Sequence, residues 1–159
     1  MPDGANANLI TILIADDDPD DRMLAQEALE ECRLANDVRF VENGLELLAY
    51  LRREGRFAAP GAAPRPGLIL LDLNMPKMDG REALRALKAD PTLRRIPVVV
   101  MTTSKAEEDI FRTYDLGVSS YVAKPVSFDG LVEVMKAIGR YWLSIVELPE
   151  MRELQEARR

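Results

Sequence analysis

An apolar run from Leu68 to Leu71 leads directly into Asp72 and restricts the fold of this chain more than any other feature. An uninterrupted apolar run of this length predicts a strand that is buried on both faces. Such strands occur in parallel sheets that helices cover on both sides. Functional groups gather beyond the carboxyl ends of these strands, so we expect Asp72 to lie at a functional site.

The rest of the chain predicts alternating strands and helices. The expected strands span residues 9–15, 38–41, 68–71, 96–102 and 120–123. A helix with a capping residue is expected after each of them; the predicted caps are Asp18, Asn43 with Glu46, Asp79 with Glu82, Ser104 with Glu107, and Ser127. This alternation predicts an α/β fold of the doubly wound (βα)5 type, which is flavodoxin-like, with a parallel sheet. The last helix is expected to be extended, reaching Leu148 before Pro149 ends it.

Length and composition favour one domain. The chain has 159 residues, of which 47% are hydrophobic, and this is enough for one core. We expect an N-terminal tail at 1–8, the domain at 9–148 and a C-terminal tail at 149–159. No apolar run approaches the roughly 20 residues that cross a membrane. Residues 1–8 do not resemble a signal peptide, so we expect a cytoplasmic protein without a membrane partner.

Two further properties of the composition exclude classes of function. The chain contains no histidine, which rules out imidazole as a catalytic base or a metal ligand. Any chemistry must therefore use carboxylates, hydroxyls and lysines. The net charge is −6 and the basic residues are scattered, which argues against a nucleic-acid partner because phosphate binding needs clustered cations.

Polar residues follow four of the expected strands, and they are Asp16 with Asp17, Asp72, Thr102 and Lys124. Because parallel strands end at one edge of the sheet, these side chains are expected to converge. Three close carboxylates need a cation, and an oxygen-only site favours Mg²⁺ over Zn²⁺. Mg²⁺ typically uses one or two carboxylates, which leaves one free to act as a nucleophile. The lysine and the threonine would then bind phosphoryl oxygens.

The acidic pair, the stretch DLNMPKMDG around Asp72, Thr102, and Lys124 with Pro125 resemble the receiver domains of two-component response regulators in order and spacing. The resemblance covers about residues 9–146. It implies that a histidine kinase phosphorylates Asp72. The short connections also fit the strand order 2-1-3-4-5 of this family.

The resemblance further implies individual roles for the residues around Asp72. They are Asp17 as a direct Mg²⁺ ligand, Asp16 as a ligand through water, the Asn74 main-chain carbonyl as a further ligand, Thr102 and Lys124 as phosphoryl contacts, Tyr121 as a switch aromatic, and a cis peptide bond between Lys124 and Pro125. A narrower resemblance, in EEDIFRTYDLGVSSYVAKPVSF and YWLSIVELP, is to stand-alone regulators that partner phytochrome kinases.

Alternative interpretations remain for several residues and for the function. Asp18 and Asp21 could be read as further metal ligands, but helix capping is the preferred explanation for both, and we leave them out of the metal site. Tyr121 could be a core residue only. A phosphatase of the haloacid dehalogenase type would need a second acid two residues after Asp72, where Asn74 stands. A binding module that is never phosphorylated is the other alternative.

The last helix carries more apolar surface than its own core requires. We therefore expect a homodimer that forms through the helix after Ser104, the strand at 120–123 and the last helix. The candidate interface residues on the last helix are Val134, Tyr141, Trp142, Ile145 and Leu148.

Overall fold

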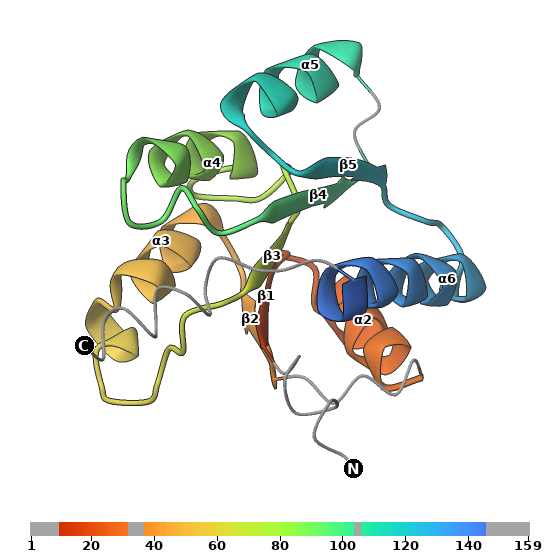
Figure 1. The fold of residues 1–159 in the computed structure, drawn as a ribbon, viewed down its shortest axis with the longest axis horizontal. Helices are drawn as coiled ribbons and strands as arrows, with labels where there is room; N and C mark the ends of the chain where they lie inside the picture. The colour runs from red at the N-terminus through yellow and green to blue at the C-terminus, as the bar shows by residue number, and fades with distance from the viewer. Residues whose placement is uncertain (1–9, 32–36, 104–105, 146–159) are drawn as a thin grey trace.

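The computed structural model describes residues 10–31, 37–103 and 106–145. Five strands form one parallel sheet in the order β2-β1-β3-β4-β5 (Figure 1). They are β1 (Thr11–Ala15), β2 (Asp37–Val41), β3 (Leu68–Leu71), β4 (Val98–Thr102) and β5 (Ser120–Ala123). The predicted fold class and strand order are confirmed.

The helices cover both faces of the sheet. Helices α2 (Pro19–Glu31) and α6 (Phe128–Ile138) lie together on one face, while α3 (Gly44–Arg52), α4 (Gly80–Ala89) and α5 (Glu107–Leu116) lie on the other (Figure 1). A single 3-10 turn, η1 (Gly55–Phe57), follows α3. The sheet is therefore doubly wound.

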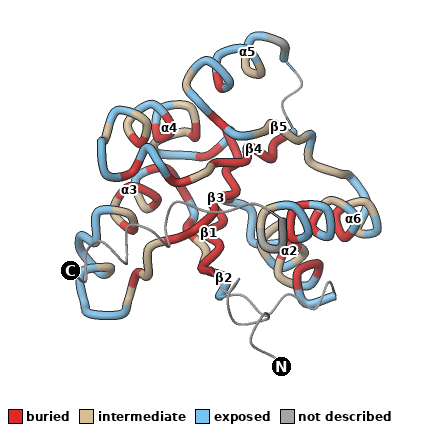
Figure 2. The backbone as a smooth tube through the Cα atoms, in the orientation of Figure 1, coloured by how far each residue is buried: buried red, intermediate tan, exposed pale blue. Residues whose placement is uncertain are grey.

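Two apolar clusters fill the space between the sheet and its helices. Alternate residues of β3 divide between them: Ile69 and Leu71 pack toward α3 and α4, whereas Leu68 and Leu70 pack toward α2 and α6. Successive strand residues point to opposite faces, so a strand covered on both sides must be apolar throughout. Figure 2 shows the central strands as the most continuously buried part of the chain. This burial explains why the run from Leu68 to Leu71 has no polar alternation.

The described helix starts agree with most of the predicted caps. The side chain of Asn43 accepts a hydrogen bond from the Glu46 N–H, and that of Asp79 accepts from Arg81 and Glu82. Ser127 accepts from the Gly130 N–H, and Asp18 accepts from that of Asp20. Helix α5 begins at Glu107 with Ala106 at its N-cap, and the predicted cap Ser104 lies outside the described residues.

The last helix changes its geometry part of the way along. Helix α6 ends at Ile138, and the chain continues as a π-helix, η2, from Gly139 to Ile145. The predicted extension is thus helical as far as Ile145, but with the wider i→i+5 turn, and Leu148 lies outside the described residues. Within the described part of the chain, no helix combines the length and apolarity needed to cross a membrane.

Candidate functional site

The acidic residues are placed by the ladder of the sheet. Ala15 of β1 is opposite Leu71 of β3, so the residues that follow, Asp16 and Asp72, leave the sheet side by side. The Asp72 N–H donates to the Ala15 carbonyl at 3.0 Å, and the Asp16 N–H donates to the Val41 carbonyl at 3.0 Å. The main chain is therefore fixed up to and including both aspartates.

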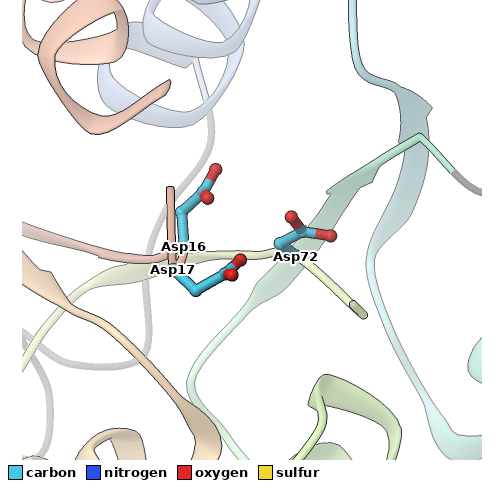
Figure 3. A group of neighbouring side chains, drawn as sticks. All are labelled: Asp16, Asp17 and Asp72. Carbon is cyan, nitrogen blue, oxygen red and sulfur yellow. The ribbon is translucent and has the colours of Figure 1, made fainter. Parts of the chain in front are cut away.

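Three carboxylates meet at this edge of the sheet. One oxygen from each of Asp16, Asp17 and Asp72 lies within 4.8 Å of the others, and Figure 3 shows the three side chains at the ends of their two strands. Asp16 and Asp72 are buried, whereas Asp17 is exposed. The predicted convergence of the acidic pair with Asp72 is confirmed.

Lys124 crosses from the end of β5 into the acidic cluster. Its Nζ lies 2.8 Å from Asp16 Oδ2, 2.9 Å from Asp21 Oδ2 and 3.0 Å from Asp72 Oδ2. Burial alone would lower the pKa of Lys124, but the hydrogen bonds to Asp16 and Asp21 outweigh it and raise that pKa above its usual value. Lys124 is therefore a fixed positive charge at neutral pH.

The negative charge of the Asp16 carboxylate is only partly compensated by its hydrogen-bond donors. Burial raises the pKa of its carboxyl above the ordinary value, against the opposing effect of hydrogen bonds from Lys124 and the Asp18 N–H. The neighbouring charge of Asp72 raises it further. One ammonium therefore leaves this cluster short of positive charge.

The carboxylate of Asp72 is held at both oxygens. Oδ1 accepts from the Thr102 hydroxyl at 2.8 Å and from the Asn74 N–H at 3.1 Å, while Oδ2 accepts from Lys124. Thr102 is completely buried at the end of β4, and its main-chain carbonyl accepts from the Lys124 N–H at 2.8 Å. Asp72 is thus an oriented carboxylate, suited to attack on an electrophile.

The segment after Asp72 makes a close main-chain contact with α4. The Gly80 N–H donates to the Leu73 carbonyl at 2.8 Å. A Cβ at Gly80 would overlap with the Asp72 carbonyl oxygen and would lie 2.7 Å from Leu73 Cα. Only glycine permits this contact, which fixes the start of α4 against the candidate phosphoacceptor.

The donor set fits a hard divalent cation. All the clustered ligand atoms are carboxylate oxygens, which suit Mg²⁺ and offer none of the nitrogen or sulfur ligands that Zn²⁺ prefers. The incomplete compensation of the acidic charge fits a bound cation as well. The cluster of Asp16, Asp17 and Asp72 is therefore the candidate Mg²⁺ site.

The peptide bond between Lys124 and Pro125 does not have its predicted geometry. The described residues contain no cis peptide bond, so the predicted cis bond between Lys124 and Pro125 is wrong. Proline lowers the preference for trans to about 0.5–1 kcal/mol without reversing it, and the lysine reaches its three partners from the trans form.

Tyr121 is partly buried and packs against the core cluster of the α3 and α4 face. Its N–H donates to the Tyr114 hydroxyl at 3.2 Å.

The structure adds Asp21 to the residues expected from the sequence. The sequence explained it as a helix-start residue, and it does lie in the first turn of α2. Its side chain nevertheless binds Lys124. The position of Asp21 in the sequence could have indicated this contact, because the first turn of a helix that directly follows β1 lies beside the carboxyl edge of the sheet.

Comparison with known proteins agrees with this geometry. Residues 12–136 match the response regulator receiver domain. The response regulator Rcp1 of Synechocystis sp. is 40% identical over 94% of this chain and 99% of its own length. The structure of the phosphorylated cyanobacterial phytochrome response regulator RcpA is 47% identical, with a TM-score of 0.82, covering 89% of this chain and 99% of RcpA.

A structure of the Mn²⁺-bound form of Rcp1 is also similar, with 40% identity, a TM-score of 0.81 and coverage of 88% of this chain and 99% of that one. The fold and the site define a signalling domain rather than a classical enzyme. This chain belongs to the response regulator receiver domain family.

Proposed function

We propose that this chain is a phosphorylation switch that accepts a phosphoryl group from a sensor histidine kinase onto Asp72. The observation that carries the proposal is the environment of the Asp72 carboxylate. Thr102 donates to one of its oxygens and Lys124 to the other, at 2.8 and 3.0 Å. Groups that hold a carboxylate oxygen can also stabilise the charge that develops on a transferred phosphoryl group.

The transfer balances when the kinase imidazole carries a proton on its other ring nitrogen, so that it leaves as the neutral base. A carboxylate oxygen of Asp72 attacks the phosphorus, the bond from phosphorus to the kinase imidazole nitrogen breaks, and the nitrogen keeps the electron pair. Water later attacks the aspartyl phosphate, which releases inorganic phosphate and restores the carboxylate. We propose that catalysis by this chain is confined to these two reactions on Asp72.

We propose that Asp16, Asp17, Asp72 and the main-chain carbonyl of Asn74 hold Mg²⁺, with Asp16 acting through water. When bound there, Mg²⁺ would neutralise charge on the carboxylates and on the phosphoryl oxygens. Lys124 contributes a fixed ammonium beside Asp72, and Thr102 contributes a buried hydroxyl. We further propose that Thr102 follows the phosphoryl oxygen and that Tyr121, on the neighbouring strand β5, repacks in response.

Phosphorylation by acetyl phosphate tests the proposal against its rivals. We expect one phosphoryl adduct by mass spectrometry in the presence of Mg²⁺, with none after EDTA treatment and none in Asp72→Asn. Asp115→Asn removes an exposed acid of α5 and serves as the matched control. Multiple turnover of small phosphate esters would instead indicate a phosphatase, for which Asn74 replaces the required second acid. The absence of an adduct and of any released phosphate would indicate a binding module.

We propose a phytochrome-type kinase as the partner. The similarity to RcpA, a cyanobacterial phytochrome response regulator, extends over 89% of this chain. The measurement is phosphotransfer from purified autophosphorylated kinases at equal concentration. Transfer from a phytochrome-type kinase at least about tenfold faster than from a kinase of another sensor class would support this pairing, since tenfold corresponds to about 1.4 kcal/mol of discrimination. Equal rates would contradict it.

We also propose a homodimer through α5, β5 and α6. Phe111 and Tyr114 of α5 and Tyr141 after α6 are large and exposed, with 73%, 48% and 51% of their surfaces accessible. Of the other predicted interface residues, Val134 and Trp142 pack partly against their own core. The structure does not describe the side chain of Ile145 or any part of Leu148.

Light scattering at micromolar concentration tests the dimer. We expect a dimeric mass that Phe111→Glu reduces to a monomer, because a charge would be buried in the interface. Leu45→Glu, at a similarly exposed position on α3, is the matched control and should remain dimeric. A monomeric wild-type protein would overturn the proposal.

A further inference from the structure

Asp21 contacts the lysine of the site without belonging to the candidate metal cluster. Its Oδ2 lies 2.9 Å from Lys124 Nζ, whereas the clustered carboxylates are those of Asp16, Asp17 and Asp72. The Asp21 side chain is 34% exposed, compared with 9% for those of Asp16 and Asp72. Asp21 thus approaches Lys124 from the solvent side.

The hydrogen-bonding capacity of the ammonium gives this contact a separate role. A lysine ammonium has three N–H donors and no acceptor. Its acceptors here are Asp16, Asp21 and Asp72. Two of these carboxylates belong to the candidate metal and phosphoryl site, and Asp21 lies outside it. The bond to Asp21 is therefore the one that involves neither the candidate phosphoacceptor nor a candidate metal ligand.

The first turn of α2 holds Asp21 in place. The next residue, Arg22, donates from Nη1 to the Asp16 carbonyl at 2.8 Å and from Nη2 to Glu42 Oε1 at 3.0 Å. These bonds tie the turn to the segments that follow β1 and β2. A carboxylate on a fixed turn loses little conformational freedom when it binds a cation, so its contact with Lys124 is preorganised.

We propose that Asp21 is a positioning residue that anchors Lys124 beside Asp72 while the other two ammonium donors turn to the phosphoryl oxygens. This inference rests on the proposed phosphorylation of Asp72. Without Asp21, the ammonium is held only by carboxylates that take part in the reaction. Transfer then slows because the lysine must be ordered as the phosphoryl group arrives.

The test measures the rate of phosphorylation by acetyl phosphate in Asp21→Asn as the Mg²⁺ concentration is raised to saturation. At saturation, the variant should be slower than the wild type by about tenfold, the effect of losing much of one charge-assisted hydrogen bond. Asp20→Asn is the matched control, because Asp20 is an exposed acid in the same helical turn. It should retain the wild-type rate.

Saturation with Mg²⁺ distinguishes a role of Asp21 in positioning Lys124 from a role in attracting the cation. An acid that only attracts the cation would give a deficit that disappears at high Mg²⁺, and this result would overturn the proposal. Circular dichroism and the thermal unfolding midpoint establish that each variant is folded. An adduct in the wild type with an unchanged rate in Asp21→Asn would overturn this inference alone, whereas no adduct in the wild type would overturn the proposed function itself.

A double-mutant comparison shows whether Asp21 acts through Lys124. If it does, Asp21→Asn should cause no further loss in a Lys124→Ala background, and an additive loss would overturn the proposal. A second measurement needs no phosphorylation. Exchange of the Lys124 ammonium protons, followed by NMR in the metal-free protein, should be at least about threefold faster in Asp21→Asn, because one charge-assisted bond that protects them is lost. Exchange that matches Asp20→Asn would overturn the anchoring role.

Discussion

Arg81 of α4 and Asp109 of α5 form a bidentate ion pair, with Nε to Oδ1 and Nη2 to Oδ2 distances that are both 2.7 Å. Among its described residues, helix α5 contributes few buried side chains. Its N-cap residue, Ala106, provides no side-chain hydrogen bond, and among its described side chains Thr113 alone is buried. The ion pair is therefore a principal link between α5 and the rest of the domain.

We expect Arg81→Ala to lower the free energy of unfolding by about 1 kcal/mol, the upper part of the range for partly exposed ion pairs, because the geometry is bidentate. Denaturation by urea measures this change, and amide hydrogen exchange should increase mainly in Glu107–Leu116. Arg85→Ala, at an exposed position of the same helix, should change stability by no more than a few tenths of a kcal/mol. Equal effects of the two substitutions would contradict the role of the pair.

Thr102→Val keeps the shape of a buried side chain and removes its hydroxyl. The free energy of unfolding should fall by about 1 kcal/mol, because Oδ1 of Asp72 loses one buried donor. Asp72 should still accept a phosphoryl group, but the NMR shift changes at Tyr121 that accompany phosphorylation in the wild type should be lost. Thr102→Ser, which retains the hydroxyl, should preserve these changes. A normal response in Thr102→Val would show that the hydroxyl does not couple the two residues.

Gly80→Ala should displace the segment that carries Asp72. The added Cβ overlaps with the main-chain carbonyl of Asp72, and forced overlap of this kind typically costs about 1–3 kcal/mol. Thermal and urea unfolding measure the cost. Gly130→Ala is the comparison, because the nearest atom to its Cβ is the Ser127 hydroxyl at 3.0 Å, which is a side-chain atom. The prediction fails if Gly80→Ala is the better tolerated substitution.

Lys124→Met removes the ammonium from among its three carboxylate partners. In EDTA, the free energy of unfolding should fall by about 3 kcal/mol, as when one partner of a buried ion pair is lost. Mg²⁺ should restore part of this loss, because a ligand that binds only the folded state stabilises it. Urea denaturation with and without Mg²⁺ measures both effects. Unchanged stability in EDTA would contradict this prediction and would mean that protons on the carboxylates replace the charge of the ammonium.

The sequence was sufficient for the fold and for the centre of the site, for a physical reason. Parallel strands bring their carboxyl ends to one edge, so Asp16, Asp72, Thr102 and Lys124 follow from the strand assignments alone. Asp21 did not follow, because it lies on a helix rather than at the end of a strand, and its place at the start of α2 already had a local explanation. Pairing of that kind depends on the packing of α2 against the segment after β5.

The remaining differences concern local geometry that residue patterns do not distinguish. The sequence of Lys124 and Pro125 permits both peptide isomers, and the described structure contains the trans form. The apolar spacing after Phe128 predicts a helix, but it does not distinguish an α-helical turn from the π-helical turn at Gly139–Ile145. Both outcomes depend on the fit of the surrounding chain rather than on the residues themselves.

The contact between Gly80 and the Asp72 main chain also determines which parts of the domain can move independently. It joins α4 to the segment of Asp72 through backbone atoms, so we expect the two to move together. Helix α5 is instead connected through side chains, namely the pair of Arg81 with Asp109 and the Tyr114 hydroxyl. We therefore expect α5 to be more compliant than α4, and a mechanical response that starts at Asp72 would reach the surface on this side, where Phe111 is exposed.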